Sequence, residues 1–208
     1  MSDPDRNPPL VLASSSPRRR ELLGALGLAF VVDPPGIPEP EPDHLADEAA
    51  VAAWVAQLAR SKAAAVAGAY APDHWVLGAD TTVVLGNRVF GKPRDRAEAV
   101  EMILALQGRT HAVLTAVALM AGGAADGEVT VVRTGVTFYP CSRAQAEAYV
   151  AAGESLDKAG AYAAQGRGAL IIERLDGCYF NVVGLPLATV ARLLGRVGFD
   201  LWRGGEGR

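Results

Sequence analysis

The centre of the predicted fold lies in the stretch Trp75-Val-Leu-Gly-Ala-Asp-Thr-Thr-Val-Val-Leu-Gly-Asn-Arg-Val-Phe-Gly-Lys92. Residues 75–79 form an apolar run that is typical of a buried strand, and the run stops at Asp80. Gly86-Asn87 is a signal for a two-residue turn, so residues 82–85 and 88–91 are predicted to form a hairpin. A buried strand that ends on a carboxylate beside a hairpin is a candidate for a functional site.

The register of this hairpin brings two charged side chains together. If Leu85 pairs with Arg88 across the turn, Thr81 comes opposite Lys92, and Asp80 is the next residue along the strand. An aspartate beside a lysine can bind a metal ion or accept a proton from water. The pair can also be a turn-forming aspartate that is simply salt-bridged to a lysine, and the pair alone does not separate these readings.

Outward from this stretch, short apolar runs alternate with segments of helical periodicity. Further strands are predicted at 10–13, 30–32, 111–120 and 129–138, and at 169–175 and 178–183 around the hairpin signal Asp176-Gly177. Helices are predicted at 17–26, 47–68, 95–106, 142–152 and 186–197. Because there is no strict βαβ repetition, we expect a mixed α/β sheet with helices packed against it. One domain is expected over 10–197, with flexible termini at 1–9 and 198–208.

A second candidate site is Ala13-Ser-Ser-Ser-Pro-Arg-Arg-Arg20, where a strand runs into a small-residue turn and a helix. Serine is a favoured N-cap, and proline suits the first helical position. The N–H groups at such a helix end attract anions, whereas Arg18 and Arg19 in the first turn oppose the helix dipole. This placement is explained if a phosphate chain binds there to amides, serine hydroxyls and guanidinium groups. The alternative is a set of solvated arginines on a surface helix.

Three further segments carry polar groups whose role the pattern leaves open. Lys62 lies in the Ala-rich helix, where a lysine is usually a solvated charge. Glu39, Glu41 and Asp43 lie in a Pro-rich loop and can supply a carboxylate to a hard cation, or simply keep the loop exposed. The segment Asp157-Lys-Ala-Gly-Ala-Tyr-Ala-Ala-Gln-Gly166 suits a backbone that lines a pocket, with the amide of Gln165 available to read a base edge. It can also be an ordinary loop.

The composition argues against several classes of protein. The chain has 208 residues, of which 50% are hydrophobic and 6% aromatic, and its net charge is −3. These values favour a packed core and disfavour a nucleic-acid partner. The chain has only two cysteines and three histidines, and their spacing suggests neither a disulfide framework nor a His-built zinc site. No membrane-spanning run and no signal-peptide pattern are seen, so we expect a cytoplasmic protein with no membrane partner.

Taken together, these segments resemble the Maf family of nucleotide pyrophosphatases. The motifs occur in the family's order from about Leu10 to Leu194, and Pro38 departs from the family pattern by replacing an acidic residue beside Glu39. The matching motifs are Leu12-Ala-Ser-Ser-Ser-Pro-Arg-Arg-Arg20, Leu77-Gly-Ala-Asp-Thr81, Gly91-Lys-Pro-Arg94, Gly108-Arg-Thr-His111, Asp157-Lys-Ala-Gly-Ala-Tyr162 with Gln165, and Val182-Val-Gly-Leu-Pro-Leu187.

The resemblance implies a mixed, mostly antiparallel, elongated sheet flanked by helices, with two lobes around a central cleft, and usually a homodimer. It also implies hydrolysis of a nucleoside triphosphate to the monophosphate and pyrophosphate, supported by Mg²⁺ or Mn²⁺. The resemblance gives roles to nine residues. Asp80 would be the general base or a metal ligand, Lys92 a second catalytic residue, and Glu39 a metal ligand. The substrate would be bound by Ser14, Arg18, Arg19, Lys62, Thr81 and Gln165.

Gln165 and the 157–162 segment resemble the branch of the family that acts on dTTP and UTP. Two alternatives stay open at this point. One is a 7-methyl-GTP-type pyrophosphatase of the same family, and the other is a non-catalytic nucleotide-binding regulator of cell division.

Overall fold

The computed structural model describes residues 7–39, 42 and 44–202. Its strands are β1 (Leu10–Ala13), β2 (Val31–Val32), β3 (Trp75–Leu85), β4 (Arg88–Phe90), β5 (Thr110–Ala121), β6 (Glu128–Phe138) and β7 (Ile172–Asp176). Its helices are α1 (Pro17–Gly24), α2 (Glu48–Ala67), α3 (Arg96–Leu106), α4 (Arg143–Ala151), α5 (Tyr179–Val183) and α6 (Leu187–Arg196). Two short 3₁₀ helices, η1 (Ala159–Ala161) and η2 (Gly166–Leu170), precede β7.

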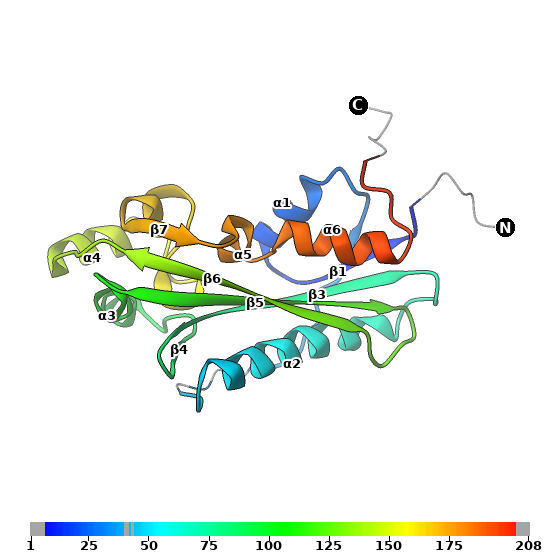
Figure 1. Cartoon of the computed structure of the whole chain (residues 1–208), viewed down its shortest axis with the longest axis horizontal. Helices are drawn as coiled ribbons and strands as arrows, with labels where there is room; N and C mark the ends of the chain where they lie inside the picture. Colours follow the sequence, from blue (N-terminus) through cyan, green and yellow to red (C-terminus); the bar gives the residue numbers. More distant parts are fainter. Residues whose placement is uncertain (1–6, 40–41, 43, 203–208) are drawn as a thin grey trace.

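The strands form one seven-stranded sheet in the order β2-β1-β3-β5-β6-β7, and β4 pairs with β3. β1 runs parallel to β2 and β3, whereas the pairs β3–β4, β3–β5, β5–β6 and β6–β7 are antiparallel. The expected mixed, mostly antiparallel sheet flanked by helices is therefore confirmed, and Figure 1 shows how β3, β5 and β6 give it an elongated shape.

Four helices begin directly after a polar residue that caps their first turn. The side chains of Ser16, Asp47, Asp95 and Ser142 each accept a hydrogen bond from a backbone N–H in the first turn of α1, α2, α3 and α4. Such a bond satisfies one of the N–H groups that a helix start leaves without a partner, and it is worth about 1 kcal/mol. No helix among the described residues is both long and apolar enough to cross a bilayer.

The two faces of the sheet bury different cores, because successive side chains of a strand point to opposite faces. α2 lies along one face of the sheet, and α1 and α6 lie over the other (Figure 1). The strand residues that face away from α2 join two apolar clusters, one with residues of α1 and α6 and the other with residues of α3 and α4. The α2 core contains Val51, Val55, Ala59, Ala63, Val76, Val84, Leu114, Ala116 and Met120. The cluster beneath α1 and α6 contains Leu22, Leu23, Leu77, Val117, Leu187 and Leu194. The cluster beside α3 and α4 contains Val83, Ile103, Val113, Val136, Phe138 and Val150. The two clusters on the face opposite α2 mark the two lobes that were expected.

The edge of β3 has a gap that opens the space between the lobes. β1 pairs with β3 as far as Gly78, and β4 pairs with it again only from Val83 onward. Within the described chain, neither strand pairs with residues 79–82. Backbone groups and side chains of this short stretch are therefore available at the edge, and Asp80 and Thr81 lie within it.

One predicted element is wrong. Residues 178–183 were expected to be the second strand of a hairpin, but they form α5 across the face of the sheet. The reason is Asn181, which is fully buried and whose Nδ2 donates to Val113 O and to Thr134 Oγ1. These bonds hold the segment over β5 and β6 instead of beside β7.

Predictions for the two ends of the chain fall partly outside the described residues, which exclude 1–6, 40, 41, 43 and 203–208. Glu41, Asp43 and most of the expected flexible termini belong to that part. Where the ends are described, Asp200 N donates to Asn7 Oδ1, and Phe199 is buried in the cluster beneath α6.

Gly78 offers a test of the packing between α2 and β3. A Cβ atom at this position would lie 2.5 Å from Ala59 O and 2.8 Å from Ala63 N, both of which are backbone atoms of α2. We expect Gly78→Ala to lower the free energy of unfolding by about 1–3 kcal/mol, because the helix must move away from the strand. Urea denaturation measures the change.

Gly195→Ala in α6 is the matched control, since no atom beyond the neighbouring backbone of its own helix lies within 4 Å of its added Cβ. This variant should gain up to about 1 kcal/mol from helix propensity. Equal stability of the Gly78→Ala variant and the wild type would contradict the close packing.

Candidate active site

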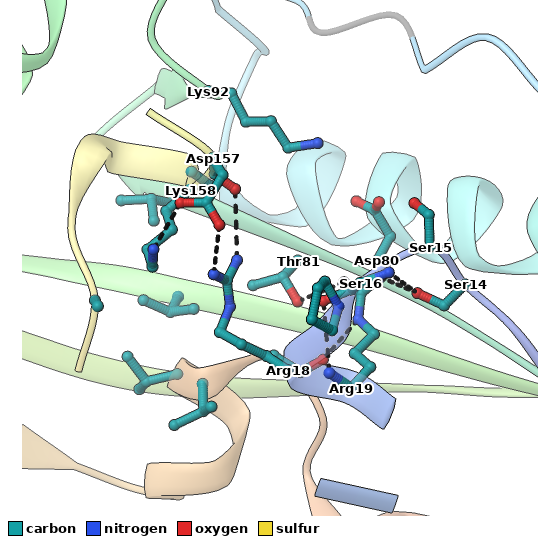
Figure 2. A pocket seen from close by; sticks show the side chains of 18 of the residues that line it. Ser14, Ser15, Ser16, Arg18, Arg19, Asp80, Thr81, Lys92, Asp157 and Lys158 are labelled. Carbon is teal, nitrogen blue, oxygen red and sulfur yellow. Dashed lines mark hydrogen bonds and ion pairs between the residues drawn. The ribbon is translucent and has the colours of Figure 1, made fainter. Parts of the chain in front are cut away.

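A cavity of about 250 Å³ lies at the gap in the edge of β3, between the two lobes. All nine residues predicted for the site line it, although they come from six different parts of the chain: Ser14, Arg18, Arg19, Glu39, Lys62, Asp80, Thr81, Lys92 and Gln165. Figure 2 shows Ser14 and Arg19 on one side of this pocket and Lys92 entering from another. The structure thus brings the predicted residues together.

A buried lysine joins the two acidic residues of the predicted site. Lys62 Nζ lies 2.7 Å from Asp80 Oδ1 and 2.8 Å from Glu39 Oε2. Lys62 and Asp80 are only 4% and 7% exposed, because α2 packs directly on the face of β3 to which Asp80 points. A charge in such a position is retained only if it is paired, and the two carboxylates supply the pairing.

Lys92 takes a different place from the one expected. β4 ends at Phe90, so the strand pair between Thr81 and Lys92 does not form. Lys62 of α2 is an ion-pair partner of Asp80 that the hairpin register did not predict. The strand stops because the carbonyl of Gly91 accepts a hydrogen bond from Gly160 N instead of continuing the ladder. Lys92 still lines the cavity.

Arg19 is buried and binds mainly to the protein itself. Its guanidinium donates to Gly184 O at 2.9 Å, to Ala79 O at 2.8 Å, to Thr81 Oγ1 at 3.0 Å and to Ser14 Oγ at 3.4 Å. Burial lowers the pKa of Arg19, and the charges of Asp80 and Glu39 partly oppose this shift. A guanidinium has five N–H donors, and the four bonds above use most of them within the fold. One N–H is therefore left for a ligand.

Arg18 lies nearer to the solvent and reaches the opposite wall of the cavity. Its Nη1 lies 2.8 Å from Asp157 Oδ2, and Nη2 donates to Asp157 O at 3.4 Å, as Figure 2 shows. Lys158 Nζ lies 2.6 Å from the other oxygen of the same carboxylate. The side chain of Asp157 is 63% exposed, and exposed pairs of this kind contribute little to stability, so Arg18 can exchange its partner for a bound anion.

Sequence reasoning missed a buried polar network behind the cavity. Thr81 Oγ1 lies 3.0 Å from Thr115 Oγ1, and Thr115 in turn donates to the carbonyl of Asn181. The network connects β3, β5 and α5, and through Thr81 it also reaches Arg19. The signal for it is Asn181 itself, a polar residue inside the apolar run 178–183 that predicts a strand.

The charges of the cavity suit an anionic ligand. Its basic side chains, Arg18, Arg19, Lys62, Lys92 and Lys158, outnumber its acidic ones, Glu39, Asp80 and Asp157. Partial burial tends to raise the pKa of Glu39, but the bond and charge of Lys62, with the charges of Lys92 and Arg19, bring it below its ordinary value. Glu39 is therefore a carboxylate near neutral pH.

The donor set also fits a hard divalent cation. Glu39 and Asp80 converge on one point, Lys62 Nζ, and each has a second oxygen beyond that contact. Mg²⁺ is usually bound by one or two carboxylates together with phosphate oxygens and water, so two carboxylates suffice when a nucleotide supplies the rest. The described residues contain no cluster of three or more protein ligands for a metal. A metal at this site would therefore depend on the substrate.

Comparison with protein families gives a match over residues 9–197 to the family described as Maf-like protein. The chain belongs to the Maf family. The resemblance seen in the sequence motifs is thereby confirmed over nearly the whole chain.

Members of the Maf family with curated names are close to this chain. A protein of Moorella thermoacetica named dTTP/UTP pyrophosphatase is 53% identical over 193 residues, which cover 93% of this chain and 97% of that protein. A protein of Pelotomaculum thermopropionicum with the same name is 49% identical over 92% of this chain and 98% of that protein. A nucleoside-triphosphatase / dITP/XTP pyrophosphatase of Mycobacterium abscessus, a solved structure, aligns with a TM-score of 0.40 and 15% identity over 91% of this chain and 97% of its own.

His111 of this Maf-family chain supports one wall of the cavity. Its Nε2 lies 2.8 Å from the hydroxyl of Tyr162, which lines the cavity, and its ring makes edge contacts with Phe138 and Tyr162. Burial lowers the pKa of His111 to about 4, so the imidazole is neutral in the folded protein.

This buried histidine predicts a pH dependence of stability. Below about pH 6.5 the unfolded chain takes up a proton at His111, whereas the folded protein does not. The free energy of unfolding therefore decreases as the pH falls from about 6.5 toward 4. Between pH 7 and pH 5 the loss from this group should be about 2 kcal/mol. Urea unfolding of the wild type and of His111→Gln at both values measures it, and parallel pH curves for the two proteins would contradict the prediction.

Proposed function

We propose that this Maf-family protein hydrolyses dTTP and UTP to the nucleoside monophosphate and pyrophosphate. The observation that carries the proposal is the Lys62-centred pair of carboxylates in a cavity whose charge is otherwise basic. The names of relatives that are about half identical over more than nine-tenths of their length support the same reaction and the same two substrates.

Asp80 supplies the base in this proposal. Its Oδ1 is held by Lys62, and its Oδ2 is the atom that can accept a proton from water. The water oxygen then forms a bond to the α-phosphorus, and the bond from that phosphorus to the oxygen bridging to the β-phosphate breaks. The electron pair of the broken bond leaves with pyrophosphate.

Charge neutralisation is the second part of the proposal. The triphosphate is strongly anionic, and its leaving group gains further charge as the bond breaks. Arg18, Lys62 and Lys92 line the cavity from three different elements or loops and are placed to balance that charge. When bound at Glu39 and Asp80 together with the phosphates, Mg²⁺ or Mn²⁺ supplies further positive charge there.

The far wall of the cavity supplies base recognition. Residues 158 to 165 contribute Lys158, Ala159, Tyr162, Ala163, Ala164 and Gln165 to it. Small side chains let a flat base approach the backbone, and the amide of Gln165 can both donate to and accept from a pyrimidine edge. Two expectations drawn from the family resemblance and the sequence, a homodimer and a cytoplasmic location, complete the proposal.

Product analysis with a panel of nucleoside triphosphates and Mg²⁺ or Mn²⁺ tests the reaction. We expect monophosphate and pyrophosphate, formed fastest from dTTP and UTP. Turnover of 7-methyl-GTP alone would retain the reaction but refute the substrate preference. No turnover of any nucleotide with either metal would refute the enzyme and favour a binding protein that regulates cell division.

Asp80→Asn tests the role of the base. We expect a loss of turnover of at least about 100-fold, because general base catalysis commonly contributes that much and the amide cannot accept the proton. Circular dichroism and thermal unfolding establish that the variant is folded. Asp126→Asn, which removes an exposed ion pair with Arg60, is the control and should keep wild-type turnover. A folded Asp80→Asn variant with near-normal activity would disprove the assignment.

A further inference from the structure

The wall of the cavity that carries Gln165 has an irregular backbone. Gly160, Ala161 and Gly166 all have positive φ values, of 70°, 61° and 64°. Outside the 3₁₀ helices η1 and η2, this segment has no strand partner in the described chain, so its N–H groups need other acceptors. Two of those acceptors are side chains from outside the cavity.

The first acceptor is Tyr149 of α4. Its hydroxyl accepts a hydrogen bond from Ala163 N at 3.1 Å. The ring is buried in the apolar cluster of α3 and α4 and is only 6% exposed, so the hydroxyl has a fixed position. Ala163 precedes Gln165 by two residues and is therefore held from the side of α4.

The second acceptor is Glu154, which follows the C-terminal end of α4. Both of its carboxylate oxygens accept from Arg167 N, at 3.2 Å and 3.0 Å. A Cβ atom on Gly166 would lie 2.7 Å from Glu154 Oε1, and a positive φ disfavours any other residue there. Arg167 follows Gln165 by two residues, so the amide-bearing residue is held on both sides.

A third contact closes this turn. A Cβ atom on Gly168 would lie 1.8 Å from Ala163 O, so the chain after Gln165 returns to touch the chain before it. Gln165 is thus at the tip of a tight loop whose two ends are fixed by Tyr149 and Glu154. Both of these residues are in the described part of the chain, and neither lines the cavity.

We propose that Tyr149 and Glu154 are positioning residues that set the base preference of the enzyme through Gln165. The inference rests on the proposed function, because it assumes that the cavity binds a pyrimidine nucleotide. An amide distinguishes one base edge from another only if its donor and acceptor are held in register with that edge. A hydrogen bond to Ala163 N or Arg167 N fixes the backbone on which that register depends, without touching the phosphates or Asp80.

Tyr149→Phe and Glu154→Ala test the proposal by the ratio of kcat/KM for UTP to that for CTP. The two nucleotides differ at one base edge and carry the same triphosphate. We expect the ratio to fall about 3- to 10-fold in each variant, the effect of losing one hydrogen bond. Glu154→Gln keeps an acceptor oxygen at the same length and should restore most of the ratio. The controls Tyr139→Phe and Glu147→Ala alter exposed residues and should leave it unchanged.

A double-mutant comparison separates positioning from general damage to the fold. In a Gln165→Ala background, neither Tyr149→Phe nor Glu154→Ala should change the ratio further. A folded variant with an unchanged ratio, or an equal fall in the absence of the Gln165 amide, would overturn the proposal. If Tyr149→Phe does not fold, Glu154→Ala alone decides, because its side chain is not part of the core.

The test also distinguishes this inference from the proposed function. Calorimetric binding of UTP and CTP gives the same ratio without turnover. Turnover with an unaffected ratio would refute only the inference. A wild-type protein without turnover would refute the proposed function, and its binding ratio would still support or overturn the positioning role. No preference between UTP and CTP in either measurement overturns the inference.

Discussion

The guanidinium of Arg19 is the interaction on which the site depends. It connects the turn after β1, the middle of β3 and the end of α5 by hydrogen bonds to Ser14, Ala79, Thr81 and Gly184. Its bond to Ala79 O satisfies a carbonyl at the edge of β3 that neither β1 nor β4 reaches. Burying a cation is costly unless it is well paired, and here carbonyl and hydroxyl oxygens surround it, with Asp80 and Glu39 close enough to favour its charge. An uncharged residue at this position would leave several buried polar groups without partners.

The second constraint is the pairing of buried charges across the face of α2. Lys62 meets Asp80 and Glu39 at hydrogen-bond distances, so the helix, the strand and the Pro-rich loop are joined at one atom. Removing Lys62 would leave two carboxylates without the cation that they share, in a poorly solvated place. A nucleotide can enter because the cavity keeps more basic than acidic side chains after this pairing is counted.

Much of this arrangement could be predicted from the sequence, and the failures have physical causes. Periodicity and capping residues indicated nearly all helices and strands, and the motifs named all nine site residues that the structure brings together. The pattern could not show that Lys62 is buried, because an Ala-rich helix has small residues on every side and no clear polar face. It misread residues 178–183, since one buried asparagine bonding to β5 and β6 outweighs an apolar run. Counting residues from the turn predicted the right register for β4 but not its length. A hydrogen bond between Gly91 and Gly160, which are far apart in the sequence, decides where β4 ends.

The two neighbouring residues Asp80 and Thr81 serve opposite sides of the sheet. Asp80 meets Lys62 of α2, whereas Thr81 meets Arg19 and Thr115 on the other face. Side chains alternate along a strand, so a single inserted or deleted residue between Trp75 and Asp80 would exchange the two faces. The carboxylate would then point at the guanidinium and the hydroxyl at the lysine. A change of length in this strand would therefore break both networks at once.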